Sequence, residues 1–122
     1  MDKTVLIYGL KGPELLKLLP LCKSAGIRCK AVSDSKTRYT VDELLSDREL
    51  SSQEPFPLSG KYALLDGFSG NLGEISSIIN QVCPGVIKAV HTEHNGSWRF
   101  SDLCFAILQE HNTIEMLKKN KK

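Results

Sequence analysis

The stretch Thr4-Val5-Leu6-Ile7-Tyr8-Gly9 is an uninterrupted run of β-favouring residues that stops at a glycine. A strand without polar residues is typical of a position where both faces are covered, in the interior of a sheet. The stretch Tyr62-Ala63-Leu64-Leu65 has the same character and ends at Asp66-Gly67. The two stretches therefore predict the two central strands of an α/β sheet.

Two further β-favouring runs carry charges in their middle. These are Arg28-Cys29-Lys30-Ala31-Val32 and Val86-Ile87-Lys88-Ala89-Val90, and this pattern is typical of edge strands. Right-handed crossovers from each central strand place the edge strands outside, in the order 2-1-3-4. We expect a small three-layer, doubly wound sheet of four mostly parallel strands, with the first and last helices on one face and the middle two on the other. An α+β fold in which one strand runs antiparallel is the alternative.

Helix signals lie between the predicted strands. Pro13 opens a helix that Gly26 closes, and Pro20 predicts a kink or break inside it. Capping boxes open two more helices, at Thr40-Val41-Asp42-Glu43 and Asn71-Leu72-Gly73-Glu74. A final helix follows from about Phe100, and we expect its inner face to hold Leu103, Cys104, Ile107, Leu108 and His111.

The second half of the chain resembles the first when it is shifted by 58 residues. Six of the thirty pairs from Val5 to Asp34 are identical, above the roughly two expected from average residue usage. This indicates a duplicated β-α-β-α unit. The chain of 122 residues is expected to form a single domain over 1–122, with a first repeat at about 4–50, a loop at 51–60, a second repeat at about 61–117 and a Lys-rich tail at 118–122.

Charge disfavours nucleic acid as a partner. Sixteen Lys and Arg face fourteen Asp and Glu, but four of the Lys lie in the tail, which leaves twelve against fourteen in the body. A slightly acidic body is a poor match for phosphates. No apolar run approaches the roughly 20 residues of a membrane span, and the N-terminus lacks the features of a secretory signal. We therefore expect a cytoplasmic protein that does not bind membranes.

The four cysteines, Cys22, Cys29, Cys83 and Cys104, form no C-x-x-C pair and no zinc-ribbon spacing. We interpret them as reduced thiols that fill small spaces in the core. Cys83, which precedes Pro84, is expected to be the most accessible of them.

The segment from Lys88 to His111 resembles a bacterial family known as domain of unknown function 3783. The residues that carry the resemblance are Thr92, Asn95, Trp98, Leu103, Glu110 and His111, and the match spans about 61–111. Arg99 departs from the pattern, because the family usually has Thr or another capping residue after the Trp. The resemblance implies no activity, since the family has none established.

Ligands of an open parallel sheet bind outside the carboxyl ends of its strands. Residues that follow the predicted strands are therefore the candidate ligand-binding set: Gly9, Lys11, Gly12, Asp66, Ser69, Asn71, His91, His94, Asn95 and Trp98. The spacings Gly9-x-x-Gly12 and Gly67-x-x-Gly70 match neither a P-loop nor a dinucleotide fingerprint. They are more typical of simple strand-to-helix turns.

His91 and His94 are weak metal candidates, because a zinc site needs a third protein ligand and their loop does not fix both side chains on one face. We interpret Trp98 as a plug at the start of the last helix and Asn95 as a turn residue, a type that tolerates a left-handed backbone. We predict no resident metal, no cofactor and no catalytic residue.

These patterns favour a small α/β module without catalysis, which binds a protein partner or a small ligand. A homodimer is one form that such binding can take. An edge strand or the Phe56-Pro57-Leu58 loop is the expected contact. The alternative is a metal-dependent sensor or enzyme at the His91–Trp98 loop. That alternative requires His91 or His94 within hydrogen-bond distance of Asp66, Asp34 or Glu93, around a concave pocket.

Overall fold

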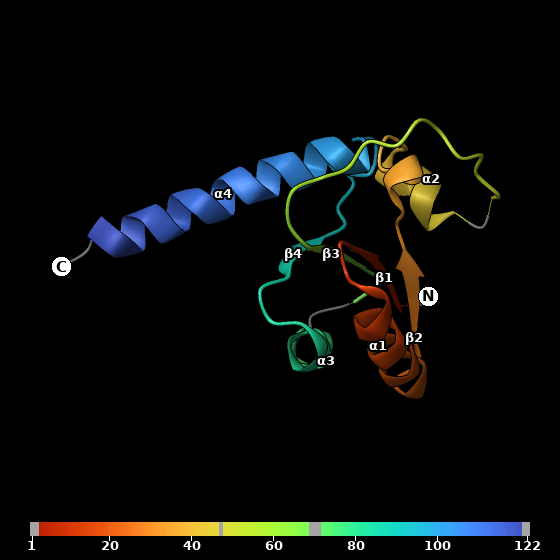
Figure 1. Cartoon of the computed structure of the whole chain (residues 1–122), viewed down its shortest axis with the longest axis horizontal. Coiled ribbons are helices and arrows are strands. Elements are labelled where there is room, and N and C mark those ends of the chain that lie inside the picture. Colours follow the sequence, from red (N-terminus) through yellow and green to blue (C-terminus); the bar gives the residue numbers. More distant parts are fainter. Residues whose placement is uncertain (1–2, 47, 69–71, 121–122) are drawn as a thin grey trace.

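The computed structural model describes residues 3–46, 48–68 and 72–120. A four-stranded sheet in the order β2-β1-β3-β4 separates two layers of helices (Figure 1). The uninterrupted apolar runs form the central strands β1 (Lys3–Tyr8) and β3 (Tyr62–Asp66), and the charged runs form the edge strands β2 (Ile27–Ala31) and β4 (Ile87–Val90). The predicted α/β class and strand order are confirmed.

The helices are α1 (Gly12–Ser24), α2 (Val41–Leu45), α3 (Gly73–Val82) and α4 (Phe100–Asn120), with a short 3-10 turn, η1, at Asp34–Lys36. α1 continues through Pro20, so of the expected kink or break, the break is wrong. Cys83, which follows α3, is 3% exposed, so its expected accessibility is wrong. The capping box of α2 is confirmed, because Glu43 N donates to Thr40 Oγ1 at 3.1 Å and Thr40 N donates to Glu43 Oε1 at 3.0 Å.

The two central strands run antiparallel. β1 pairs in parallel with β2, and β3 pairs in parallel with β4, but Leu6 of β1 lies opposite Leu64 of β3 in an antiparallel register. The sheet is therefore mixed. The carboxyl ends of the strands therefore lie at two opposite ends of the sheet. β1 and β2 finish at one end, and β3 and β4 finish at the other.

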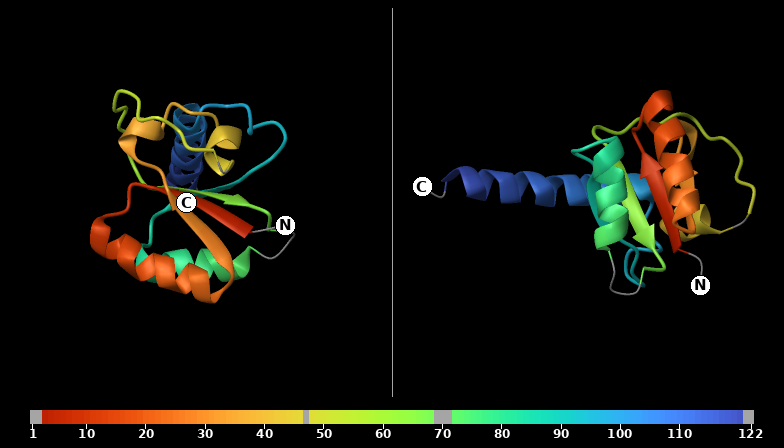
Figure 2. Two further views of the ribbon diagram at one scale, coloured as in Figure 1. Left: turned by 90° about the vertical axis from the view of Figure 1, so that its right-hand side faces the viewer. Right: turned by 90° about the horizontal axis from the view of Figure 1, so that it is seen from below.

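The direction of the central pair also decides which helices share a layer. Side chains from α1 and α3 pack on one face of the sheet against Val5, Ile7 and Leu65. Side chains from α2 and α4 pack on the other face against Leu6 and Leu64. Figure 2 shows these two pairs of helices on opposite sides of the sheet. The expected pairing of the first helix with the last is wrong, because a right-handed crossover from an antiparallel strand places its helix on the same face as the first one.

An internal two-fold relation runs through the sheet, and it agrees with a duplicated unit. Its axis passes the Leu6–Leu64 pair and an isolated antiparallel bridge between Thr40 and Arg99. Hydrogen bonds repeat on both sides of this bridge. Val41 N donates to Trp98 O at 2.9 Å, and the equivalent Phe100 N donates to Tyr39 O at 2.8 Å.

The gapless shift of 58 residues does not extend to the edge strands. Leu6 lies beside Lys30, whereas the equivalent Leu64 lies beside Ala89, one position past Lys88. Successive side chains of a strand point to opposite faces. Lys30 therefore reaches the α2 layer, where Nζ donates to Ser46 O at 3.0 Å, and Lys88 reaches the α3 layer, where Nζ donates to Asn80 Oδ1 at 2.9 Å.

The last helix is much longer than the layer it belongs to. α4 starts in the core with Phe100, Leu103 and Cys104 and then projects away from the sheet (Figures 1 and 2). His111 is exposed, so its expected place on an inner face is wrong. None of the helices described by the structure combines the length and apolar character needed to cross a bilayer.

Candidate functional site

The candidate ligand-binding residues do not all lie at the same end of the sheet. Gly9, Lys11 and Gly12 follow β1, whereas Asp66 ends β3 and His91 follows β4 at the opposite end of the sheet. The expected single site between β1 and β3 is therefore wrong, since it required parallel central strands. Ser69 and Asn71 lie outside the described residues.

At the β1 end, Gly9 allows two backbone segments to approach each other. Its φ is +90°, and a Cβ atom there would lie 2.6 Å from the carbonyl oxygen of Gly60. Lys11 N donates to Glu14 Oε1 at 2.9 Å at the start of α1. Gly12 has open space around the position of a Cβ. This end is built from a strand-to-helix turn and the loop before β3.

At the opposite end, His91 lies between two carboxylates. Its Nδ1 is 2.8 Å from Asp66 Oδ1, and its Nε2 is 3.0 Å from Asp42 Oδ1. The His91 side chain is 22% exposed. Asp66 and His91 come from neighbouring parallel strands, but Asp42 comes from the first turn of α2 in the other repeat. Sequence reasoning missed Asp42, because the only signal there was its place in the capping box.

This arrangement ties three elements of secondary structure together. Both ring nitrogens lie within hydrogen-bond distance of a carboxylate oxygen. A metal ligand must instead offer a nitrogen lone pair. Within 3–46, 48–68 and 72–120, no three His, Cys, Asp or Glu side chains are placed to hold a metal ion. His91 links the ends of β3 and β4 to the start of α2.

Asn95 organises the loop after β4 with its side chain. Its Oδ1 accepts a hydrogen bond from Thr92 N at 2.8 Å, and its Nδ2 donates to Val90 O at 3.0 Å. Asn95 lies in a turn, as expected, and its backbone is not left-handed, since positive φ angles occur only at glycines among the described residues. The Thr92–Asn95 spacing of the resemblance thus has a structural role, and His94 is exposed on the same loop.

Trp98 and Phe100 differ in burial at the start of α4. Trp98 is 45% exposed, and Phe100 is 1% exposed in the core beneath α4. Phe100 therefore fills the space at the start of the helix, and the predicted Trp98 plug is wrong.

An apolar groove lies between the 56–59 loop and α4. It encloses about 400 Å³. The residues that line it are Phe56, Pro57, Leu58, Ser59, Tyr62, Ser101, Asp102, Cys104, Phe105 and Leu108. Three other hollows on the described surface also have linings that exclude His91. The histidine thus meets the hydrogen-bond condition of the catalytic alternative, but these hollows do not supply its pocket.

Two buried tyrosines hold the loop that forms one wall of this groove. The Tyr8 hydroxyl donates to Asp34 Oδ1 at 2.5 Å and accepts a hydrogen bond from Leu58 N at 2.8 Å. The Tyr62 hydroxyl donates to the carbonyl oxygen of Ser59. Burial and, second, the bond to Asp34 raise the pKa of Tyr8. The groove is therefore fixed by the core of the sheet.

No family model matches the chain, and no curated protein or solved structure matches it. The fold and the described contacts define an α/β protein with a mixed four-stranded sheet.

Proposed function

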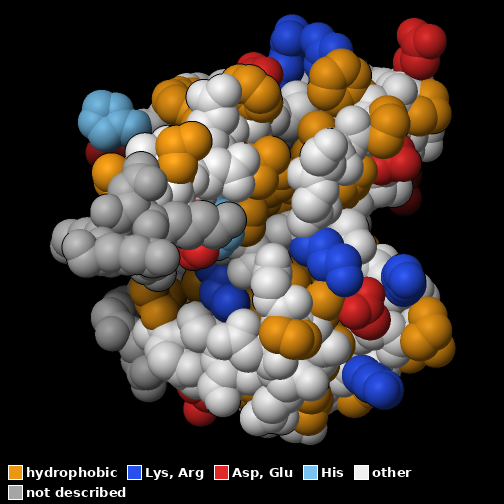
Figure 3. All heavy atoms as spheres, turned by 60° about the vertical axis from the view of Figure 1, so that its left-hand side comes forward, with side chains coloured by type: hydrophobic (Ala, Val, Ile, Leu, Met, Phe, Trp, Pro, Cys, Tyr) orange, Lys and Arg blue, Asp and Glu red, His pale blue; other side chains and the backbone are white. Residues whose placement is uncertain are grey.

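We propose that this protein is a non-catalytic binding module that pairs with a second copy of itself through α4. The observation that supports this most directly is the apolar surface of the projecting helix. Met116 is 65% exposed, Leu117 is 61% exposed and Phe105 is 62% exposed. Figure 3, which brings this end of the molecule forward, shows hydrophobic side chains exposed among charged ones.

The spacing of apolar residues supports a helix as the occupant of this surface. Leu103 and Ile107 pack against the core; Ile114 lies seven residues beyond Ile107, and Leu117 lies three residues beyond Ile114. Apolar residues at these intervals are typical of helix–helix contacts. A helical segment of about ten residues is marginally stable alone in water, so the projecting half gains stability from a partner helix.

Charge supports a second copy in antiparallel orientation. Asp102, Glu110 and Glu115 lie along most of α4, whereas Lys118 and Lys119 belong to its last turn. Antiparallel pairing places the basic end of each chain beside the acidic part of the other. Parallel pairing would align like charges, which is unfavourable. The resemblance to domain of unknown function 3783 is compatible with a binding role and adds no activity.

Light scattering during size-exclusion chromatography tests the proposal. We expect a dimer for the native chain and a monomer for the double variant Ile114→Glu/Leu117→Glu, with circular dichroism to confirm the fold. Leu16→Glu is the matched control, because Leu16 is 73% exposed on α1, and it should remain dimeric. A monomeric native chain would contradict the proposal, and so would a dimer that Leu16→Glu dissociates and the α4 variant does not.

A further inference from the structure

The α2 side of the sheet has a hollow of about 530 Å³ beside the end of β2, and we name it the β2 hollow. Three buried apolar side chains form its floor: Leu6, Val32 and Leu44. A volume of this size is typical of small-molecule pockets. The carboxyl ends of parallel strands are also the usual place for ligands in α/β sheets. Both its size and its position therefore suit a small ligand.

In the second repeat, a helix covers the equivalent part of the sheet. Val41 and Phe100 begin α2 and α4 at equivalent positions. α2 ends at Leu45, whereas α4 continues and packs Ile107 and Leu108 against the core beside β4. The short α2 leaves the corresponding part of β2 without a helix above it, and the β2 hollow lies there.

The edge strands at these two places differ in charge. Leu6 of the first repeat lies beside Lys30, whereas the equivalent Leu64 lies beside Ala89. The small apolar side chain of Ala89 packs beneath α4 with the rest of the core. A lysine at the equivalent position lines the β2 hollow instead. The first repeat thus has a cation where the second repeat has an apolar contact with a helix.

Cations from three separate segments line the β2 hollow. Lys30 comes from β2, Lys36 from η1 and Arg48 from the chain that follows α2. Glu49 is the one acidic residue among the described residues of the lining. Lysine and arginine side chains together suit a phosphate group, because its oxygens accept several charge-assisted hydrogen bonds. The lining therefore offers a phosphate-binding wall above an apolar floor.

Hydrogen bonds hold two of these cations, or the segments that carry them, in place. Lys30 Nζ donates to two carbonyl oxygens at the end of α2, at 3.0 Å and 3.4 Å. An ammonium has three N–H groups, so a third donor is left for a ligand. η1, which carries Lys36, is tied to the loop before β3 by the hydrogen bond from Gln53 N to Ser35 O at 2.9 Å. The walls of the hollow are thus fixed by the fold.

We propose that the β2 hollow binds a small organic phosphate. The phosphate group contacts Lys30, Lys36 and Arg48, and the apolar part of the ligand rests on Leu6 and Val32. This binding does not depend on pairing through α4, because α4 projects past β4, at the edge of the sheet opposite β2 (Figure 1). The two proposals can therefore fail separately.

Two-dimensional NMR of the full chain, labelled with nitrogen-15, tests the proposal. The probe is phenyl phosphate, which carries a phosphate group and an apolar ring, titrated at constant ionic strength. We expect saturable shifts of the backbone amide signals of residues 30–32 and 36. Inorganic phosphate lacks the ring and benzoate lacks the phosphate, so each should bind about fivefold more weakly.

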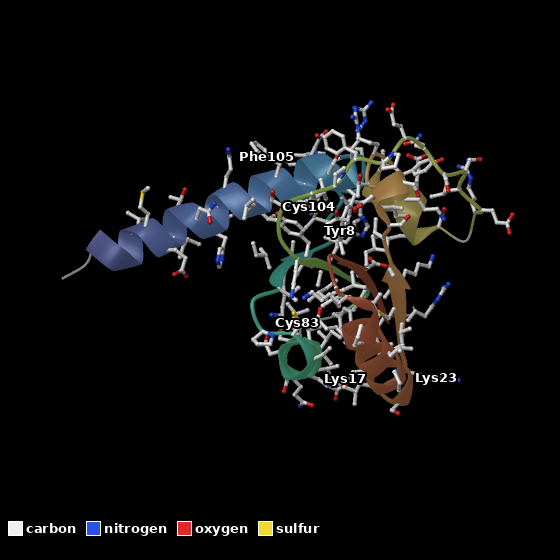
Figure 4. All side chains as sticks on the ribbon, viewed as in Figure 1. Tyr8, Lys17, Lys23, Cys83, Cys104 and Phe105 are labelled. Atoms are coloured by element: carbon white, nitrogen blue, oxygen red, sulfur yellow. The ribbon has the colours of Figure 1, made fainter. Side chains whose placement is uncertain are left out.

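Substitutions in the lining test the role of the charges. Lys36→Met and Arg48→Met should each weaken phenyl phosphate binding by about fivefold, because each removes a charge-assisted contact that water partly screens. Glu49→Gln should strengthen it by about twofold, because it removes a like charge. Lys17→Met is the matched control and should not change binding. Lys17 is exposed on α1, on the opposite side of the sheet from α2 (Figure 4).

Several results would overturn the proposal. The first is the lack of saturable shifts at about 20 mM phenyl phosphate, a concentration at which a probe of this size should bind. Equal binding of inorganic phosphate would exclude the apolar floor, and equal binding of benzoate would exclude phosphate as the recognised group. Unchanged binding in Lys36→Met and Arg48→Met would exclude the charged wall. If one of these variants does not fold, the other variant and the comparison of probes on the native chain still decide.

Discussion

Tyr8→Phe is the substitution whose effect the structure defines most fully. Tyr8 is 7% exposed, and its ring packs against Tyr62 and Phe100 with centroids 6.4 Å and 6.3 Å away. Phenylalanine keeps this packing and removes only the hydroxyl. The bonds to Asp34 Oδ1 and from Leu58 N are then lost together.

The cost follows from these two bonds. A hydrogen bond contributes about 0.5–1.5 kcal/mol net, and one to a charged group contributes about 1.5–3 kcal/mol. Asp34 is exposed and regains a water partner, whereas Leu58 N is partly covered. We therefore expect the free energy of unfolding to fall by about 2 kcal/mol, measured by urea denaturation with an unchanged m-value.

The same variant changes the alkaline limb of the stability curve. The pKa of Tyr8 is raised by burial and by Asp34, so the folded state holds this proton more tightly than the unfolded state. Its stabilising effect is complete below the unfolded pKa of about 10 and is lost as pH rises through the folded value. Tyr8→Phe should therefore lose less stability than the native chain above about pH 10, because it has no Tyr8 hydroxyl to titrate.

Tyr39→Phe is the matched control, because it also removes one hydroxyl. Tyr39 donates to Ser51 O at 2.6 Å in an exposed position, and its loss should cost less than about 1 kcal/mol. Equal costs for the two variants, or a Tyr8→Phe variant within about 0.5 kcal/mol of the native chain, would refute the reasoning.

Two more substitutions probe the fold by the same urea assay. Pro20→Ala should stabilise the chain by about 2 kcal/mol. A proline inside a helix costs about 3 kcal/mol, and its restriction of the unfolded chain offsets up to about 1 kcal/mol of that cost. A loss of stability would show that α1 requires the proline. Gly96→Ala should cost about 1 kcal/mol, because its Cβ would lie 2.4 Å from Asp42 Oδ1 and displace it from His91. This cost should shrink in an Asp42→Ala background, and an equal cost there would exclude the clash as its cause.

The candidate site was only partly predictable from the sequence. The contact between His91 and Asp66 was predictable, because both residues lie at the ends of strands that the pattern placed side by side. Asp42 and the Lys30–Ser46 contact were not visible, because their partners lie 49 and 16 residues away and no local pattern links them. His111 was misplaced because helical periodicity shows which residues share a face and does not show where the neighbouring layer ends.

The sequence by itself determined the elements, the strand order and the division into central and edge strands. Uninterrupted apolar runs can lie only where both faces are covered, and charged runs are tolerated at edges. Only the tertiary structure decided that β1 and β3 run antiparallel. Either direction buries the same apolar strands, so the hydrophobic pattern does not distinguish them. The direction depends on how the two repeats dock around the Leu6–Leu64 pair, and it alone places His91 and the β2 hollow at opposite ends of the sheet.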